Sequence, residues 1–323
     1  MRKVAVALFL ILVVASLVFA MGEPPPPPKQ TIPKVTFIRE IGIPGSGNGQ
    51  VYFPEDVHIS MVGDISTGLG DVFVADTGNE RIERLDRSGD FVYQFGGFGS
   101  SDGKFNSPSS IYVDFNYIIY VCDKDNNRIQ KFDIRGNYRD QFGSFGTANG
   151  QFNDPTSITM DSLGKIYVAD SGNDRIERFS SDGTFLDSFG GFGWGDGFFD
   201  HPADVAVDVD RFIYVADTGN NRIQKLDEYG KPVFSIGDKG SSEGKFLKPR
   251  GIAADKNLIY VADTGNDRVQ VFTKSGNFVL AFGGKGGATG QFSGPVGLSV
   301  GEQGRLFVAD TGNHRIQEFL VNY

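Results

Sequence analysis

A single phrase of nine residues, Val-Ala-Asp-Thr-Gly-Asn-x-Arg-Ile or a close variant of it, occurs six times along this chain of 323 residues. Its aspartates follow one another at intervals of 47, 47, 47, 46 and 47 residues, and an arginine lies five positions after each of them. The pairs are Asp76 and Arg81, Asp123 and Arg128, Asp170 and Arg175, Asp217 and Arg222, Asp263 and Arg268, and Asp310 and Arg315. Self-similarity at this period is typical of solenoids and propellers.

Each repeat contains four segments of strand length. Runs rich in β-branched and aromatic residues lie on either side of the Thr-Gly-Asn triplet, for example at 165–169 and at 222–226. Glycine and asparagine tolerate the positive φ of tight turns, so the triplet predicts a hairpin. A further run ends in Phe-Gly at Phe95, and after a glycine-rich loop the motif Phe105-x-x-Pro108 leads into the next inner strand. Four short antiparallel strands are the content of one propeller blade.

The Asp-Thr-Gly-Asn-x-Arg-Ile phrase and the Phe-x-x-Pro-x-x-Ile motif resemble NHL repeats over about residues 35 to 323. The resemblance implies an all-β fold, a six-bladed β-propeller of four-stranded antiparallel blades. The last repeat stops after its third strand, whereas residues 36–42 read as an outer strand without a blade. We therefore predict that this N-terminal strand completes the last blade and closes the ring. Closure removes open sheet edges, and we expect a monomer.

The N-terminal segment differs from the rest of the chain. Arg2 and Lys3 precede an uncharged apolar stretch that ends in a small residue, Ala20, so residues 1–20 predict a secretory signal peptide or, if uncut, an N-terminal membrane anchor. Residues 21–34 form a proline-rich linker whose five consecutive prolines act as a stiff spacer of roughly 15 Å. An extracytoplasmic location, periplasmic, cell-surface or secreted, is expected, with any membrane contact made only through the anchor.

The charge of the chain limits its partners. Without Arg2 and Lys3, the 31 basic residues become 29 against 40 acidic ones, which gives a mature net charge of −11 and opposes binding of nucleic acid. The single cysteine, Cys122, excludes an intrachain disulfide, so the fold depends on its core.

The repeated aspartates and arginines predict a structural role, because catalysis needs one asymmetric constellation rather than six identical pairs. We expect each aspartate to accept turn amides and each arginine to span backbone carbonyls or carboxylates. The second repeat carries Lys124 and Asp125 in place of Thr-Gly, which predicts a different turn there.

Candidate binding residues are those that break the repeat on the loop side of the ring. We select Trp194, Arg250, Asp204, Asp56 and Ser110. Trp194 is the only tryptophan, and Arg250 follows a blade proline, so both are placed near one sector of the rim. Glu55, Asp56, Ser109, Ser110, Thr156, Asp204 and Arg250 are expected to crowd the channel entrance. A pairing of Asp204 with Arg250, or a merely solvated channel, are the alternatives.

No catalytic residues are assigned from the sequence. The three histidines, His58, His201 and His314, occupy different positions in their repeats and are not expected to converge on a metal. The leading function is therefore an exported binding or scaffold module for a protein, peptide or glycan, without a cofactor. The alternative is a lactonase-type hydrolase or lyase that uses a channel calcium held by Asp56, Asp204 and nearby carbonyls.

Overall fold

The computed structural model describes residues 33–60 and 70–322, which belong to one compact unit, Pro33–Tyr323. The predicted signal or anchor at 1–20 and most of the linker at 21–34 lie outside the described residues. No helix in the part of the chain that is described is long and apolar enough to cross a membrane.

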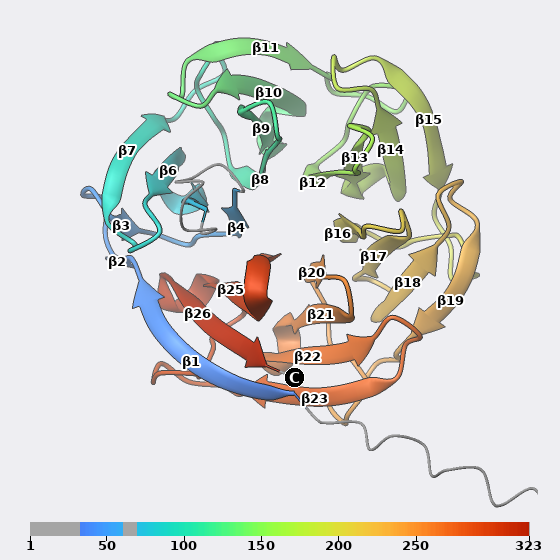
Figure 1. The fold of residues 1–323 in the computed structure, drawn as a ribbon. Coiled ribbons are helices and arrows are strands. Elements are labelled where there is room, and N and C mark those ends of the chain that lie inside the picture. The colour runs from blue at the N-terminus through green and yellow to red at the C-terminus, as the bar shows by residue number, and fades with distance from the viewer. Residues whose placement is uncertain (1–32, 61–69, 323) are drawn as a thin grey trace, which may run out of the picture. The chain divides into compact units, whose positions relative to one another are not determined.

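Six four-stranded antiparallel sheets are arranged as blades around a central channel (Figure 1). Blade 1 holds β4 (Asp56–Ile59), β5 (Val72–Asp76), β6 (Arg81–Leu85) and β7 (Phe91–Gly96), and blade 2 holds β8 (Pro108–Val113), β9 (Ile118–Asp123), β10 (Arg128–Asp133) and β11 (Tyr138–Phe142). Blade 3 holds β12 (Pro155–Met160), β13 (Ile166–Asp170), β14 (Arg175–Phe179) and β15 (Phe185–Gly190), and blade 4 holds β16 (Pro202–Val207), β17 (Ile213–Asp217), β18 (Arg222–Leu226) and β19 (Pro232–Ile236). Blade 5 holds β20 (Gly251–Ala254), β21 (Leu258–Asp263), β22 (Arg268–Thr273) and β23 (Phe278–Gly283). Blade 6 holds β24 (Leu298–Val300), β25 (Arg305–Asp310), β26 (Arg315–Asn322) and β1 (Lys34–Ile41).

The membership of β1 in blade 6 confirms the predicted closure. β1 runs antiparallel to β26 from the pair Lys34 and Asn322 to the pair Ile41 and Ile316, with one register shift after Phe37. The strand spans Lys34–Ile41, whereas the sequence predicted a strand over 36–42. Two ion pairs flank the seam, Arg39 to Glu318 at 2.6 Å and Arg315 to Glu40 at 2.7 Å. The outer edge of the last blade is therefore supplied by the start of the propeller (Figure 1).

Phenylalanines from the repeated motifs fill the spaces between blades. The motif residues Phe105, Phe152, Phe199, Phe246 and Phe292 are fully buried. Phe105, for example, packs with its ring centroid 5.6 Å from that of Phe132, at the junction of the first two blades. Most of the buried apolar residues thus lie between blades rather than at the centre of the ring, which leaves the channel free of a core.

The Thr-Gly-Asn triplet, or the three residues in its place, forms a short 3-10 turn in five of the blades. These turns are η1 (Thr77–Asn79), η2 (Lys124–Asn126), η3 (Ser171–Asn173), η4 (Thr264–Asn266) and η6 (Thr311–Asn313). Our account of the triplet was wrong in one respect, because the positive φ falls on the next residue, such as Glu80 at 56°, and not on the triplet glycine. Glycine fits at Gly78 without a shift of the loop, because a Cβ there would lie 2.5 Å from the carbonyl oxygen of Tyr52.

The turn of blade 2 has the same geometry as the others, so the prediction of a different turn was wrong. Asn127 adopts the same left-handed conformation as Glu80, with φ of 53°. The loop makes room for the Asp125 side chain by a small shift, since the distance from the Asp125 amide to the Asn106 carbonyl is 3.1 Å, against 2.8 Å for Gly78 to Tyr52. The Asp125 carboxylate then accepts a hydrogen bond from Ser107 Oγ at 2.7 Å.

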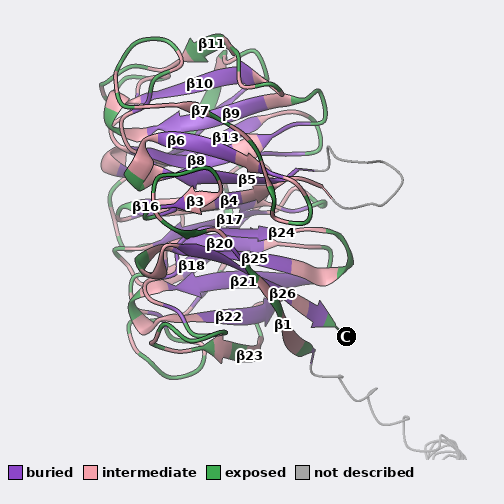
Figure 2. Cartoon of the chain, turned by 90° about the vertical axis from the view of Figure 1, so that its left-hand side faces the viewer, coloured by how far each residue is buried: buried purple, intermediate pink, exposed green. Residues whose placement is uncertain are grey.

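The ring has two different faces, seen edge-on in Figure 2. We call the side with the 3-10 turns and the glycine-rich loops the loop face; it lies on the left in Figure 2. We call the other side the opposite face; it carries the remaining hairpin turns and the C-terminal end of β26, and it faces the viewer in Figure 1. The strands between the two faces are mostly buried, whereas the loops are exposed or half-buried.

Candidate functional site

The repeated aspartate and arginine hold each blade to the loop before it. Asp170 is fully buried, and its Oδ1 accepts the amide of Asn153 at 2.7 Å while its Oδ2 accepts Arg175 Nε at 2.8 Å. The arginine then donates to three carbonyl groups of the preceding glycine-rich loop. The amide that Asp170 accepts belongs to this loop and not to the aspartate's own turn. The same aspartate to arginine contact, at 2.7 or 2.8 Å, occurs in all six blades.

A second repeated device, which the sequence analysis missed, joins neighbouring blades. The left-handed residue after each turn accepts the amide of the residue that precedes the next blade proline. Asp174 accepts the amide of His201 at 2.7 Å, and His314 Nδ1 accepts that of Phe53 at 3.0 Å across the seam of the ring. The signal was present in the sequence, because the variable position of the phrase holds an acceptor in every copy: Glu80, Asn127, Asp174, Asn221, Asp267 and His314.

The channel mouth contains a belt of hydrogen-bonded carboxyl and hydroxyl groups from the starts of the inner strands. Asp56 Oδ2 accepts Ser110 Oγ at 2.8 Å and the amide of Ile111 at 3.0 Å, and its Oδ1 accepts the amide of Val57 at 2.8 Å. Asp204 accepts Ser157 Oγ. Asp204 also accepts the amides of Val205 at 2.8 Å and Ile252 at 2.7 Å. We call these four residues, Asp56, Ser110, Ser157 and Asp204, the channel belt.

Burial without a counter-cation disfavours the charged form of both belt carboxyl groups. It raises the pKa of Asp56 to about 8, with a further contribution from the charge of Asp204. It raises the pKa of Asp204 to about 6. Neither carboxylate forms an ion pair with a described lysine, arginine or histidine. The belt therefore carries less negative charge near neutral pH than its two aspartates suggest.

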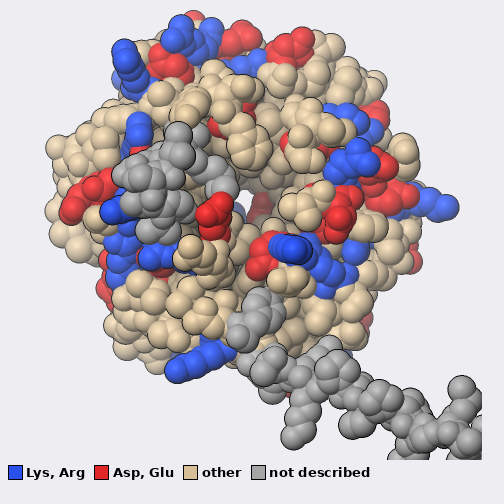
Figure 3. Space-filling model, viewed as in Figure 1, with Lys and Arg blue, Asp and Glu red and all other residues tan. Residues whose placement is uncertain are grey.

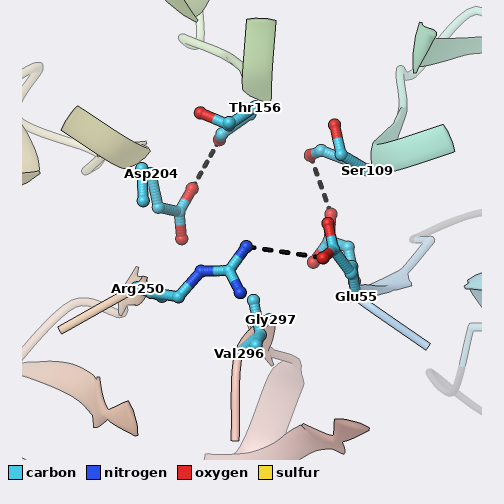
Figure 4. A pocket seen from close by; sticks show the side chains of 11 residues that line it. Glu55, Ser109, Thr156, Asp204, Arg250, Val296 and Gly297 are labelled. Atoms are coloured by element: carbon cyan, nitrogen blue, oxygen red, sulfur yellow. Dashed lines mark hydrogen bonds and ion pairs between the residues drawn. The ribbon is translucent and has the colours of Figure 1, made fainter. Parts of the chain in front are cut away.

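Arg250 lies on the loop-face side of the belt, and its partner differs from the predicted one. It pairs with Glu55 at 3.4 Å, whereas Asp204 is occupied by Ser157 and two backbone amides (Figure 4). The pocket at this mouth has a volume of only about 20 Å³, room for about one water molecule. The predicted polar ring of Glu55, Asp56, Ser109, Ser110, Thr156, Asp204 and Arg250 does line it.

Trp194 lies apart from that ring, so the structure does not bring it together with Arg250 in the pocket at the mouth. The indole does not line the pocket at the mouth, is 74% exposed and packs edge-on against Phe192, with ring centroids 5.7 Å apart. Phe98, Phe145 and Phe192 occupy one repeat position, three residues after the outer-strand phenylalanines Phe95, Phe142 and Phe189, and are 74%, 72% and 62% exposed. The sequence analysis missed this set, although the spacing Gly-x-Phe-Gly distinguishes it.

The histidines remain in three separate environments. His58 lies against Tyr112 in the channel, His314 against Tyr52, and His201 beside Asp200 on the loop face. In the described part of the chain, one group of three potential metal ligands, Asp174, Asp200 and His201, lies within 4.8 Å. Hydrogen bonds account for this group, because Asp174 accepts the His201 amide and Asp200 lies 2.6 Å from His201 Nδ1. The hydrogen bond with Asp200 raises the pKa of His201.

A family model of the NHL repeat matches residues 152–179, 199–226, 246–272 and 292–319. Each matched segment begins at a motif phenylalanine and ends within or directly after the third strand of a blade, in blades 3 to 6. The chain is an NHL-repeat β-propeller. A search of curated proteins finds no match to it.

Several solved structures share this NHL propeller's fold at low sequence identity. A streptogramin B lyase is 17% identical with a TM-score of 0.57 and covers 89% of this chain and 98% of its own. A virginiamycin B lyase from Staphylococcus aureus is 13% identical with a TM-score of 0.57, over 89% of this chain and 99% of its own. An auxiliary nutrient binding protein from Bacteroides ovatus is 14% identical with a TM-score of 0.63, over 91% of this chain and 78% of its own. Likeness at this level establishes the fold and leaves function to the residues of the site.

Proposed function

We propose that this NHL propeller is an exported binding module whose loop face engages a protein, peptide or glycan. One observation carries the proposal: four aromatic side chains, Phe98, Phe145, Phe192 and Trp194, stand on the loop face with well over half of their surface exposed. Aromatic residues of this kind supply large contact areas at little cost in conformational entropy and dominate binding surfaces.

The four aromatics lie on one arc of the ring. They follow the outer strands of blades 1, 2 and 3, whereas the same position after blades 4 and 5 holds the exposed lysines Lys239 and Lys285. At this repeat position the loop face therefore carries aromatic rings on one arc and a lysine on each of the next two blades. A partner with exposed rings or sugar faces beside an acidic group would complement both arcs.

Trp194 provides a direct assay because it is the only tryptophan of the chain. Extracytoplasmic protein fractions and glycan pools would be captured on the immobilised propeller, and the retained partner titrated while the tryptophan emission is recorded. Replacing Phe98, Phe145 and Phe192 by serine should weaken binding by about tenfold or more, equivalent to about 1.4 kcal/mol, with the melting temperature unchanged.

The matched control replaces exposed apolar residues of the opposite face, Leu163, Val209 and Tyr229, by serine. This variant should retain the affinity of the unaltered protein. Equal losses in both variants would show that binding is nonspecific, and full affinity in the loop-face variant would refute the proposal.

Hydrogen bonding at the channel belt favours a binding module over the calcium-dependent hydrolase or lyase. An ionised carboxylate offers about four acceptor positions. Asp56 uses three of them, for the Ser110 hydroxyl and two backbone amides. Asp204 also uses three, for the Ser157 hydroxyl and two backbone amides. Calcium takes about six to eight oxygen ligands, which the belt does not offer. Elemental analysis of the purified protein tests this directly: one tightly held calcium per chain would reverse the preference.

Export rests on residues 1–20, and we propose that they direct the propeller out of the cytoplasm as a monomer. The mass of the protein recovered from cell fractions distinguishes the two forms of the segment. A chain that lacks its first twenty residues would identify a cleaved signal, and a full-length chain in the membrane fraction would identify an anchor. Recovery of the full-length chain in the cytoplasm would contradict export.

A further inference from the structure

The channel widens behind the belt into a cavity of about 240 Å³ that is reached from the opposite face, where Figure 3 shows a hollow at the centre of the ring. The four belt residues line both this cavity and the small pocket at the loop face, so they form the partition between the two. The loop-face pocket on the other side of the belt has room for about one water molecule. We call the cavity the cup, and the belt is its floor.

The walls of the cup are unequal. On one side His58 and Tyr112 stand with ring centroids 4.7 Å apart, while the corresponding residues of blades 4 and 5 are Ala206 and Ala253. The rest of the wall is mixed, because most aliphatic side chains of the inner strands, such as Met160, are buried between the blades and the strands also present polar groups to the cavity. A concave site with one aromatic side and a few converging polar groups is typical of small-molecule binding.

Negative charge in the cup has no positive partner. None of the described residues that line it is a lysine or arginine, and Arg250 lies beyond the belt and pairs with Glu55. Burial lowers the pKa of His58 to about 4, so the imidazole is neutral at physiological pH. The other ionisable groups around the floor are Tyr112 and Cys122, which are also neutral there because burial raises the pKa of each.

We propose that the cup binds a small organic cation, a primary ammonium group on a compact apolar body. Each floor carboxylate has about one acceptor position left after its hydrogen bonds, too few for a metal ion but sufficient for an ammonium with three N–H donors. The small side chains of Ala206 and Ala253 leave room for the apolar body of the ligand, and the face of Tyr112 attracts cations. The site is separate from the loop face and independent of the function proposed for it.

Binding of a cation at this floor is linked to protons. The ammonium favours the ionised form of Asp56 and Asp204, so it lowers their pKa values and releases protons from groups that are protonated in the free protein. Affinity should therefore rise with pH between about 5 and about 8, the range in which these two carboxyl groups ionise.

The test uses benzylamine and its uncharged analogue benzyl alcohol with the full chain, by isothermal titration calorimetry. Benzylamine should bind about tenfold or more tightly than benzyl alcohol at pH 8 and should release protons, seen as a binding heat that depends on the buffer. Asp56→Asn and Asp204→Asn should each reduce benzylamine affinity about tenfold. Glu55→Gln, which removes a carboxylate on the loop-face side of the belt, should leave it unchanged.

Three results would overturn the proposal: no benzylamine binding at millimolar concentration, equal affinity for both compounds, or an equal loss in Glu55→Gln and Asp56→Asn. If the aspartate variants do not fold, the comparison of the two compounds and the pH dependence in the unaltered protein still decide the matter.

Discussion

Replacing Arg175 by alanine should destabilise the propeller more than the same change at its counterpart in the next blade, Arg222. Arg175 pairs with Asp170 at 2.8 Å and with Glu177 at 2.9 Å, and both carboxylates are completely buried. Glu177 Oε2 already has no hydrogen-bond partner. Removal of the guanidinium would therefore leave two buried carboxylates without their shared cation.

Blade 4 provides the matched comparison because Gln224 occupies the position of Glu177. The amide of Gln224 donates to Asp217 Oδ2 at 3.0 Å and to the Phe198 carbonyl at 2.6 Å, so Asp217 keeps a partner after Arg222 is lost. Blade 1 resembles blade 3, with Glu83 beside Arg81, and the other three blades carry glutamine.

The expected magnitudes follow from these contacts. Breaking a buried pair by removing one partner costs about 3 to 5 kcal/mol, and because the Arg175 side chain is 14% exposed and water can reach the gap, we expect about 3 kcal/mol. For Arg222→Ala we expect about 2 kcal/mol, since the groups left behind retain neutral partners. Adding Glu177→Gln to Arg175→Ala should reduce its cost to that of Arg222→Ala.

The extra cost in blade 3 should depend on pH. Burial raises the pKa of Glu177 to about 7, and the charge of Arg175 offsets part of this effect. In Arg175→Ala the offset is lost, so the pKa of Glu177 should be higher still. A carboxyl group with a raised folded-state pKa stabilises the fold while protonated, and that stability is lost as pH rises through the folded-state value. The two arginine variants should therefore be similarly stable at pH 5.5 and differ by about 1 kcal/mol at pH 8.

Urea unfolding followed by circular dichroism at both pH values measures these differences. Two results would refute the assignment of Glu177 as the source of the larger loss of stability in Arg175→Ala. One is equal free energies of unfolding for the two arginine variants at pH 8, and the other is a double variant, Arg175→Ala with Glu177→Gln, that is no more stable than Arg175→Ala alone.

Three further predictions concern the ring, the belt and the cysteine. Deleting the chain through Ile41 should lower the melting temperature of the whole propeller and reduce its solubility, because the edge of β26 becomes open; an unchanged melting curve would contradict closure by β1. The stability of the unaltered protein relative to Asp56→Asn should fall as pH rises from about 4 to about 8, because the folded-state pKa of Asp56 is raised; a difference independent of pH would show that Asp56 is ionised throughout. Cys122 is buried and its thiol pKa is raised, so a thiol reagent should label it only as fast as the protein unfolds; rapid labelling of the native protein would show local opening of β9.

The sequence by itself determined the architecture of this propeller. The interval between Asp76 and Asp123, repeated along the chain, required one blade per repeat, and the unpaired run at 36–42 required a partner strand at the end of the chain. Such inferences succeed because strand patterning, turn residues and the need to pair every edge are local or topological constraints. The composition of the channel mouth was predictable for the same reason, since a fixed offset from each blade proline fixes the start of each inner strand.

Only the tertiary structure decided which side chains share a contact. Glu55 and Arg250 come from blades far apart in sequence, and their pairing displaced the predicted contact of Arg250 with Asp204 because the latter is satisfied by Ser157 and two amides. Residue type likewise did not predict exposure, because Phe105 is buried between blades whereas Phe98, seven positions earlier, is exposed to solvent. Hydrogen-bond partners, burial and the resulting pKa values depend on distances across the ring, and a repeat pattern fixes positions within a blade but not the asymmetric contacts between them.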